Sequence, residues 1–489
     1  MSISRQLTDI DASPLDRYRA IVDDWDAFIA ALRRPLPNYI WSNTLRIASE
    51  SLRELLSREG FDAEPLASCP DAFRTPAGFR PGRHWGFHAG LYRVQDAASM
   101  LPVALLDPKP GERVLDLCAA PGGKTAQIAI GMNNSGTLVA NDLNIRRLQL
   151  VHQTLERFGI VNVSTTNCDG SNYPPAAGQF DRILVDAPCS CEGTARRQPS
   201  ILDRVGPHVS ARMSGVQRAL LKKAVQLCRA GGRIVYATCT FAPEENEAVV
   251  DAVLNEYSAG VVCVVPVRVD GFRWSPALTE WQSKRFDDAM RHALRVWPHQ
   301  NDSGGFFVAV LEKMNRVEDP EGVAAADAQR RTTDDPAARR WFDEFVQRFN
   351  IDPNQFENIR FFESTNGVSM VDTGHCAPVE PQLENPGLFF MQTGVDYPKP
   401  TMGAAIVFGA AADANVIDLS EPQRDAYLGR RTFDVVAEQI ESCTDKGYII
   451  ARYRGAVLGI AVFLPAAEGR GARVRSLFPK SWARLYQNR

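Results

Sequence analysis

Between Gly86 and Lys313 the sequence repeats one unit, in which a short apolar run is followed by a turn and then by a segment with helical periodicity. This alternation is typical of βαβ units, whose parallel strands are joined by helices. It predicts seven strands, at residues 113–117, 137–141, 161–166, 182–186, 233–237, 261–266 and 306–311. We therefore expect an α/β fold with a single, mostly parallel sheet. Open sheets of this kind bind ligands at the carboxyl ends of their strands, so functional residues are expected there.

The segment before this sheet predicts a small N-terminal α/β module. Apolar residues recur at helical spacing from Leu15 to Leu32, which predicts one amphipathic helix that ends before Pro35. Ser51 and Glu54 have the spacing of a capping box and predict the start of a second helix.

The segment after the sheet predicts a linker and a further domain. Residues 315–340 are rich in Ala, Asp, Arg and Pro and lack apolar periodicity, as expected of a connection. Short apolar runs punctuated by glycine predict a small β-rich domain with a few helices, and these runs lie at residues 404–408, 447–453 and 457–463. The expected division is an N-terminal module at 1–87, a sheet domain at 88–314, a linker at 315–340 and a C-terminal domain at 341–489.

The overall composition narrows the classes of protein to be considered. A net charge of −3 and a pI of 6.2 give no global basic field, so nucleic-acid binding requires local patches of Lys and Arg. The ten cysteines occur in a chain too large to need disulfides, which predicts reduced thiols. The sequence has no apolar run of about 20 residues and does not start like a secretory signal, so we expect a cytoplasmic monomer without membrane contact.

A glycine-rich turn follows the first predicted strand, in the sequence DLCAAPGGKT at residues 116–125. At such a turn, backbone can approach a ligand closely. The two glycines and Lys124 lack the spacing of a phosphate-binding P-loop, and the turn does not match the G-x-G-x-x-G dinucleotide motif. A lone pair of glycines is more often a connecting turn only. If the turn does bind a cofactor, a nucleoside without phosphates fits best.

Two aspartates at the next strand ends bear on this choice. Asp142 lies 26 residues after Asp116, close to the spacing at which an acidic side chain binds ribose hydroxyls. Asp169 follows the third strand, where a carboxylate can meet an adenine amino group. Each aspartate alone is more often a helix cap or a turn residue. Together with the glycine-rich turn, the two favour a nucleoside site.

Cys189 and Cys239 lie just beyond the fourth and fifth predicted strands, on the same edge of the sheet as the turn. Cytosine C5 accepts a methyl group only after a nucleophile adds at C6, and a thiolate suits this addition because it is strongly nucleophilic and leaves readily. Asp186 can hydrogen-bond the ring N3 or the exocyclic amine and stabilise the charge that develops. A base must then remove the C5 proton, and Cys189 is the candidate.

The same cysteines also have simpler interpretations. Free Cys is among the most buried residue types, and a cysteine at a strand end is structural in most cases. Cys189 and Cys191 form a C-x-C pair, but this pair lacks the second spaced pair that zinc sites need. We therefore predict no metal site, and a structural role for Cys191.

Five segments carry a family resemblance: YRVQDAASM at residues 92–100, DLCAAPGGKT at 116–125, DAPCSCEG at 186–193, TCTFAPEENE at 238–247 and GGFFV at 304–308. In this order they resemble the Sun/Fmu (NSUN-type) family of RNA cytosine-C5 methyltransferases, and within it the bacterial 16S rRNA methyltransferase RsmF group. The resemblance implies a class I S-adenosylmethionine-dependent methyltransferase with a Rossmann-like, seven-stranded sheet.

The resemblance also implies roles for individual residues. Cys239 would bond covalently to C6, Cys189 would assist release of the product, and Asp186 would reach the target base. The S-adenosylmethionine pocket would be lined by Cys118, Ala119, Ala120, Pro121, Gly122, Gly123, Lys124, Asp142, Asp169 and Asp186. The sequence departs from the family at Cys191, where the family usually has glycine.

Short motifs in the last domain resemble the PUA-like RNA-binding extension of the RsmF group. They are GLFF at 387–390, GYII at 447–450 and LFPKSW at 477–482. Contacts to RNA phosphates would come from Arg452, Arg454, Arg470, Arg473, Arg475 and Lys480. A cluster of charges is also often only a solvated face.

The predicted function is methylation of cytosine C5 in RNA, with rRNA favoured over tRNA because of the terminal domain. A DNA cytosine-C5 methyltransferase would place its nucleophile on the fourth-strand Pro-Cys, and the Thr-Cys-Thr segment after the fifth strand argues against it. A ribosome-assembly factor that binds RNA without catalysis is the remaining alternative. The presence of Cys239, Cys189 and Asp186 together argues against lost catalysis.

Overall fold

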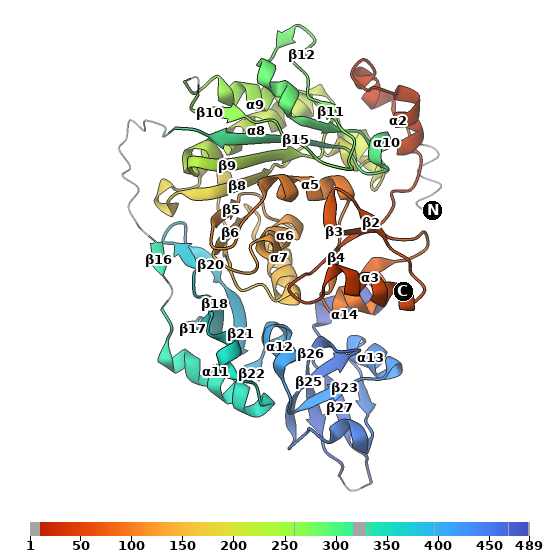
Figure 1. Ribbon diagram of the computed structural model, residues 1–489, viewed down its shortest axis with the longest axis vertical. Coiled ribbons are helices and arrows are strands. Elements are labelled where there is room, and N and C mark those ends of the chain that lie inside the picture. Colours follow the sequence, from red (N-terminus) through yellow and green to blue (C-terminus); the bar gives the residue numbers. More distant parts are fainter. Residues whose placement is uncertain are drawn as a thin grey trace.

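The structure, a computed structural model, describes residues 10–258, 260–315, 329–331, 333–395, 397–467 and 469–487. Within these residues the central sheet has ten strands (Figure 1). Its parallel strands are β5 (Arg113–Asp116), β6 (Thr137–Asn141), β7 (Val163–Thr166), β8 (Phe180–Asp186) and β9 (Cys228–Thr238). They run side by side in the order β9-β8-β5-β6-β7.

Antiparallel strands extend both edges of this parallel core. They are β10 (Val262–Val264), β11 (Ser275–Pro276), β14 (Leu294–Val296), β15 (Phe306–Lys313) and β20 (Leu383–Pro386). β15 pairs with β9, and β20 pairs with β7. Strands are present at all seven predicted positions. The predicted number of strands is too low because β11, β14 and β20, with the sequences SP, LRV and LENP, contain no run of apolar residues.

Helices cover both faces of the sheet (Figure 1). One face packs against α5 (Ala97–Leu106), α6 (Gly123–Gly131) and α7 (Ile145–Phe158), and the other against α8 (Pro207–Leu227) and α9 (Glu247–Leu254). Smaller elements of this domain are β12 (Glu280–Trp281), β13 (Lys284–Arg285) and α10 (Pro298–Asn301). The carboxyl ends of the five parallel strands therefore open at one edge between two helical layers.

The N-terminal region forms a four-stranded sheet in the order β2-β3-β1-β4 and several short helices. Its elements are the 3-10 helix η1 (Ser13–Tyr18), α2 (Trp25–Leu32), β1 (Tyr39–Ser42), α3 (Ser49–Arg58), β2 (Glu64–Leu66), β3 (Cys69–Arg74), α4 (Trp85–His88) and β4 (Tyr92–Val94).

One helix prediction in this region is wrong, and another is correct except for the residue at which the helix begins. The expected single helix is divided into η1 and α2, because the Asp24 side chain accepts a hydrogen bond from the backbone N–H of Ala27 and starts a new helix. α3 begins at Ser49, two residues before the expected capping box, and its N-terminus has no side-chain cap.

The C-terminal region contains a four-stranded sheet, β17-β18-β21-β22, and a five-stranded sheet, β23-β25-β26-β27-β24. Its elements are β16 (Gln329–Arg331), α11 (Pro336–Phe349), β17 (Ile359–Ser364), β18 (Gly367–Asp372), β19 (Cys376–Pro378), β21 (Leu388–Gln392), β22 (Lys399–Pro400), α12 (Met402–Phe408), β23 (Val416–Asp418), α13 (Glu421–Leu428), β24 (Thr432–Asp434), β25 (Gly447–Tyr453), β26 (Ala456–Leu464), β27 (Arg473–Ser476) and α14 (Lys480–Gln487).

This region is β-rich, and β25 and β26 lie where strands were expected. The expected strand at 404–408 is wrong, because the Thr401 side chain caps the backbone N–H of Ala404 and residues 402–408 form α12. Residues 316–328 and 332 of the predicted linker lie outside the described residues. α11 begins within the predicted linker, at Pro336.

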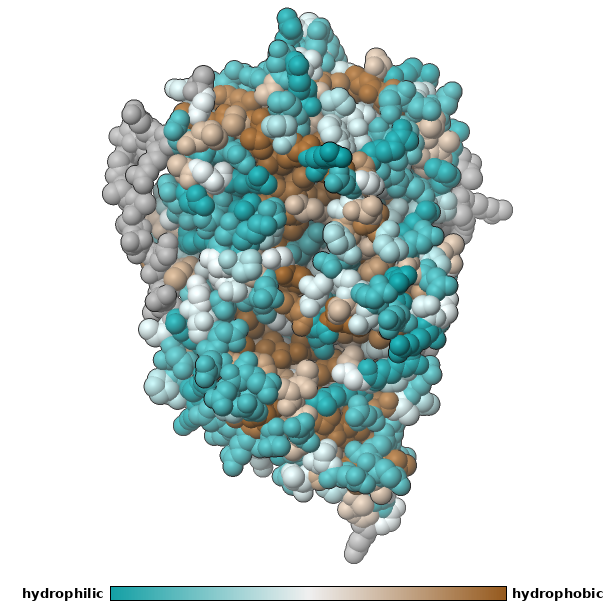
Figure 2. Space-filling view, viewed as in Figure 1, coloured by the Kyte–Doolittle hydropathy of each residue, from teal (hydrophilic) through white to brown (hydrophobic). Residues whose placement is uncertain are grey.

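The C-terminal region is packed against the rest of the molecule. It supplies β20 to the central sheet, and one apolar core is shared by N-terminal residues such as Trp85 and C-terminal residues such as Tyr453 and Trp482. The rings of Trp85 and Tyr453 lie edge to face, 4.9 Å between centroids. Figure 2 shows the face of the molecule that is seen in Figure 1, with hydrophilic residues around most of it and hydrophobic residues gathered along its middle. Among the described helices, none is both long and apolar enough to cross a membrane.

Candidate active site

Two cavities meet at the carboxyl ends of the parallel strands. We name each after a residue that lines it: the Lys124 cavity has a volume of about 280 Å³, and the Asp142 cavity about 780 Å³. The residues that line both cavities are Cys118, Ala120, Asp186 and Cys239. The predicted edge of the sheet therefore holds a site in which two thiols, Cys118 and Cys239, and the carboxylate of Asp186 face two compartments.

Two predicted aspartates line the Asp142 cavity. Asp142 follows β6 and accepts hydrogen bonds from the backbone N–H groups of Ala120, at 3.1 Å, and Asn144, at 2.9 Å. Asp169 follows β7 and accepts one from the backbone N–H of Ser171, at 2.9 Å. Both side chains thus fix the turns beside them. A carboxylate has about four acceptor positions, so each can also bind a ligand in the cavity.

Apolar side chains around the same cavity were missed by the sequence reasoning. Leu143, Ile145 and Val216 line it and are 70, 42 and 45% exposed. Large exposed apolar side chains around a cavity indicate a ligand with an apolar part, such as a nucleobase. The signal available in the sequence is Leu143, an apolar residue directly after the acidic end of a strand.

The glycine-rich turn connects β5 to α6. Gly122 has a φ of +91°, and a Cβ atom there would lie 3.0 Å from the Cα of Val151, so glycine allows the turn to pack closely against α7. The turn residues that line the Lys124 cavity are Ala119, Pro121, Gly123 and Lys124, in addition to the shared Cys118 and Ala120. Gly122 lines neither cavity. Most of the turn that was assigned to the cofactor therefore faces the smaller cavity.

Lys124 and Asp186 form an ion pair at the junction. The Lys124 Nζ donates to Asp186 Oδ2 at 2.7 Å and lies 5.2 Å from the centre of the Phe306 ring. Other charged residues that line the Lys124 cavity are Arg93, Asp96, Asp116, Arg196 and Arg197. Three of these are cations, so the smaller cavity offers donors to an electron-rich ligand.

Asp96 and a pair of glycines complete the wall of the Lys124 cavity. Asp96 caps α5 and accepts a hydrogen bond from the backbone N–H of Gly304, at 3.0 Å. The next glycine, Gly305, donates its backbone N–H to the carbonyl oxygen of Gly193 at 2.9 Å. A Cβ atom on Gly305 would lie 2.1 Å from the Phe241 ring, which accounts for a glycine at this position. Segments far apart in the sequence therefore meet at this wall.

Asp116 is a fully buried carboxyl group at the end of β5. Burial raises its pKa to about 7, although the Thr125 hydroxyl donates to it at 2.7 Å and lowers the pKa in part. Near neutral pH this group is therefore partly protonated, directly below the Lys124 cavity.

Three cysteine thiols lie together at the junction, and we call Cys189, Cys191 and Cys239 the thiol cluster. The Sγ atom of Cys189 is 3.4 Å from that of Cys239 and 3.8 Å from that of Cys191. Hydrogen bonds from Cys189 and Cys239 lower the pKa of Cys191, while contacts with the two other thiols, and then burial, raise the pKa of Cys189. A hydrogen bond with Cys189 lowers the pKa of Cys239, but the contact with Cys191 and burial together outweigh it, so the pKa of Cys239 is raised. The thiolate form of Cys191 is thus stabilised by the neighbouring thiols of Cys189 and Cys239.

The loops that carry these cysteines are joined by hydrogen bonds. The Ser190 and Thr240 hydroxyls are 2.6 Å apart, and the backbone N–H of Gly193 donates to the Cys239 carbonyl oxygen at 2.9 Å. Two buried glutamates add further links. Glu192 accepts from the Thr240 hydroxyl at 2.9 Å, and Glu245 accepts from the backbone N–H of Ser190 at 3.0 Å. The separation of Cys189 and Cys239 is therefore fixed by both loops.

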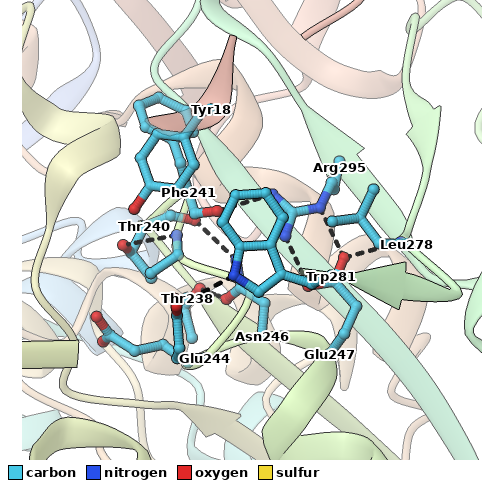
Figure 3. Close-up of polar contacts among 12 residues, drawn as sticks. Tyr18, Thr238, Thr240, Phe241, Glu244, Asn246, Glu247, Leu278, Trp281 and Arg295 are labelled. Carbon is cyan, nitrogen blue, oxygen red and sulfur yellow. Dashed lines mark hydrogen bonds and ion pairs between the residues drawn. The ribbon is translucent and has the colours of Figure 1, made fainter. Parts of the chain in front are cut away.

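A further layer of polar contacts supports the Cys239 loop from behind (Figure 3). The Thr238 hydroxyl donates to the Asn246 side chain at 2.6 Å. The guanidinium of Arg295 makes two hydrogen bonds of 2.6 Å to Glu247 and one of 2.9 Å to the carbonyl oxygen of Phe241. Because this ion pair is buried, its main effect is to orient the loop rather than to add net stability.

The cationic residues predicted for the C-terminal domain differ in their surroundings. Arg452 donates to carbonyl oxygens of Gly409 and Ala412, each at 2.6 Å, and Arg454 pairs with Glu59 of the N-terminal region. Arg473 is half-buried, whereas the exposed members of the group are Arg454, Arg470, Arg475 and Lys480. Arg452 and Arg454 therefore have structural partners.

Two family models match consecutive parts of the chain. Residues 15–97 match the N-terminal domain of 16S rRNA methyltransferase RsmF, and residues 103–312 match 16S rRNA methyltransferase RsmB/F. The second match spans the central sheet from α5 to β15, and together the two matches cover more than half of the chain.

Named relatives agree with these matches. The chain is 36% identical over 312 residues to a 28S rRNA (cytosine-C(5))-methyltransferase of Mus musculus, covering 62% of this chain and 38% of that protein. It is 37% identical over 302 residues to the ribosomal RNA small subunit methyltransferase F of Klebsiella pneumoniae, covering 60% of this chain and 61% of that protein. The chain thus spans less than two thirds of the length of these curated relatives.

A solved structure shows the same architecture. The methyltransferase homolog protein from Pyrococcus horikoshii is 31% identical, with a TM-score of 0.56, and the match covers 64% of this chain and 100% of that one.

Proposed function

Because the chain belongs to the RsmB/F family of methyltransferases, we propose that it transfers a methyl group from S-adenosylmethionine to C5 of a cytosine in rRNA. The observation that carries this proposal is the position of Cys239 and Asp186, which line both the Lys124 cavity and the Asp142 cavity. A site of this kind suits a reaction in which the target nucleobase enters one cavity and the methyl donor enters the other.

The Asp142 cavity fits a nucleoside cofactor. Asp142 and Asp169 would accept hydrogen bonds from ribose hydroxyls and the adenine amino group, while Leu143 and Ile145 would cover the faces of the adenine ring. The bound cofactor would supply an electrophilic methyl group next to the shared residues Cys118, Ala120 and Asp186.

The residues of the junction can divide the chemistry as follows. The sulfur of Cys239 adds to C6 of the cytosine as Asp186 takes the thiol proton and passes it to the ring N3, which neutralises the charge that this addition develops. After C5 has accepted the methyl group, Cys189 removes the C5 proton. The electrons of that C–H bond restore the C5–C6 double bond and expel the Cys239 thiolate. The 3.4 Å separation of the two sulfurs keeps the base next to the nucleophile.

The Lys124 cavity would receive the cytosine after it leaves its stack. A groove of about 540 Å³ shares Arg93, Val94 and Pro121 with this cavity and is also lined by Arg80, Arg83 and Trp482. Its walls come from both the N-terminal module and α14, so it can hold the RNA strand that flanks the target base. The C-terminal region would then act as a PUA-like RNA-binding domain, with exposed Arg475 and Lys480 at phosphates.

Bisulfite sequencing of total RNA tests the proposal. Strains that lack the gene are complemented with the wild-type chain or with Cys239→Ala. We expect one rRNA cytosine to lose its methylation without the gene and to regain it only with the wild-type chain. A site that appears in tRNA instead would redirect the substrate. Restored methylation with Cys239→Ala would contradict the chemistry, and an unchanged methylation pattern would favour a non-catalytic assembly factor.

A further inference from the structure

The thiol cluster contains one more sulfur than the proposed chemistry uses. Cys239 and Cys189 have roles in it, whereas Cys191 has none. The sequence alone predicted no metal site because Cys189 and Cys191 lack a second pair of ligands. The fold supplies a third sulfur from a different strand, since Cys239 follows β9 while the other two follow β8. We propose that the thiol cluster is a Zn²⁺ site, and that Zn²⁺ bound there reversibly blocks Cys239.

The spacing of the sulfurs fits this ion. Zn–S bonds of about 2.3 Å in a tetrahedral site place neighbouring sulfurs about 3.8 Å apart. In the thiol cluster two of these separations are 3.8 and 3.4 Å, and all three sulfur atoms lie within 4.8 Å of one another. Small rotations of the side chains therefore suffice to bind one ion, with the fourth position open to water.

The scaffold around the sulfurs is already in place. The hydrogen bonds between Ser190 and Thr240 and between Gly193 and Cys239 hold the two loops together. An ion would therefore meet ligands whose separation is fixed, which reduces the entropy lost on binding. All three cysteines also line the large Asp142 cavity, which gives an ion access from solvent.

The backbone at Cys191 adds an independent observation. This residue has a φ of +63°, in the left-handed region that favours glycine. A side chain here is unfavourable for the backbone, yet it places the Cys191 Sγ next to that of Cys189. Glycine at this position would relieve the backbone and remove one ligand, so Cys191→Gly is a well-matched test variant.

Binding would change the chemistry of the nucleophile. Each sulfur binds Zn²⁺ as a thiolate, so the ion displaces the protons of those thiols that are still protonated as the S–Zn bonds form. The Cys239 lone pair is then committed to the metal and cannot add to C6. Removal of Zn²⁺ by a chelator restores the free thiols without any change in oxidation state.

The test uses the full chain with Co²⁺ as a spectroscopic probe and Zn²⁺ as the competitor, under reducing conditions. We expect one Co²⁺ per chain with a sulfur-to-cobalt charge-transfer absorption, and its loss on addition of one equivalent of Zn²⁺. Cys191→Gly should weaken metal binding at least tenfold. Cys263→Ala, on β10 and outside the cluster, is the matched control and should bind the metal like the wild-type chain.

A second readout needs neither RNA nor cofactor. Zn²⁺ should slow alkylation of Cys239 by iodoacetamide, measured by peptide mass spectrometry, in the wild-type chain but much less in Cys191→Gly. Cys191→Ala serves as a second variant if Cys191→Gly does not fold. Equal metal affinity in the wild-type chain and the folded variant, or no binding to the wild-type chain at micromolar Zn²⁺, would overturn the proposal. Neither result would bear on the methyltransferase activity.

Discussion

The Lys124 cavity and the Asp142 cavity share Cys239 and Asp186 but are built in different ways. The Asp142 cavity is formed by turns after β6, β7 and β8 and by α8, all within the central sheet domain. The Lys124 cavity also needs Arg93 and Asp96 of the preceding region. The larger cavity therefore follows from the sheet itself, whereas the smaller one depends on the region that precedes it. This difference predicts that cofactor binding and RNA binding can be changed separately.

The largest expected effect comes from the carboxylate that both cavities share. Asp186→Ala should lower kcat by about 10²–10⁴-fold, because it removes the group that stabilises charge on the ring and the partner of Lys124. Methyl transfer from labelled cofactor to RNA measures this loss. Asp181→Asn, on the same strand but at its opposite end, is the control and should retain kcat. A comparable loss in both variants would contradict the assignment.

Asp116 lines the Lys124 cavity but not the Asp142 cavity, and it should make the stability of the protein depend on pH. Its pKa is about 7 when folded and about 3.8 ordinarily, so the folded chain binds more protons between these values. The free energy of unfolding should therefore fall as pH rises from 4 to 7, by up to about 4 kcal/mol from this group. Asp116→Asn should flatten this dependence in denaturant unfolding at pH 5 and pH 7.5. An identical pH dependence in the variant would refute the role of Asp116.

A matched pair of variants separates the cavities directly. Leu143→Ala should weaken binding of S-adenosylhomocysteine about tenfold, because about 1.4 kcal/mol of contact with the adenine ring is lost. Arg197→Ala should weaken RNA binding by a similar factor and leave cofactor binding unchanged. Calorimetry and filter binding measure the two affinities. If either variant impaired both ligands equally, the division into two compartments would be wrong.

The smallest effect is expected in the C-terminal region. Arg475→Ala should weaken RNA binding a few-fold and reduce the slope of log affinity against log salt by about one. Arg452→Ala should instead lower Tm, because its guanidinium holds backbone carbonyls. An unchanged salt slope for Arg475→Ala would count against a phosphate contact at this position.

The same contrast explains what the sequence could predict. Strand periodicity and acidic strand ends located β5 to β9, and they placed Asp142, Asp169, Asp186, Cys189 and Cys239 at one edge, because neighbouring parallel strands end together. These are local signals, and the Asp142 cavity is made from them.

Long-range packing could not be predicted in this way. The contact of Gly304 with Asp96 joins residues about two hundred positions apart, and β20 reaches the central sheet from the C-terminal region. The separate starts of α2 and α12 depended on caps by Asp24 and Thr401, which periodicity alone does not reveal. The sequence placed Cys189 and Cys239 at one edge of the sheet, but the approach of all three sulfurs to within 4.8 Å of one another depends on the fold.

The most direct test of the central claim is a search for a covalent protein–RNA complex on denaturing gels. In the Cys189→Ala variant, Cys239 should still add to the target cytosine and the methyl group should still be transferred, but the reaction should then stall. The result is a stable adduct that mass spectrometry assigns to Cys239. The double variant Cys189→Ala/Cys239→Ala should form none. Free, fully methylated RNA released by the Cys239→Ala chain, or an adduct that persists in the double variant, would contradict the account.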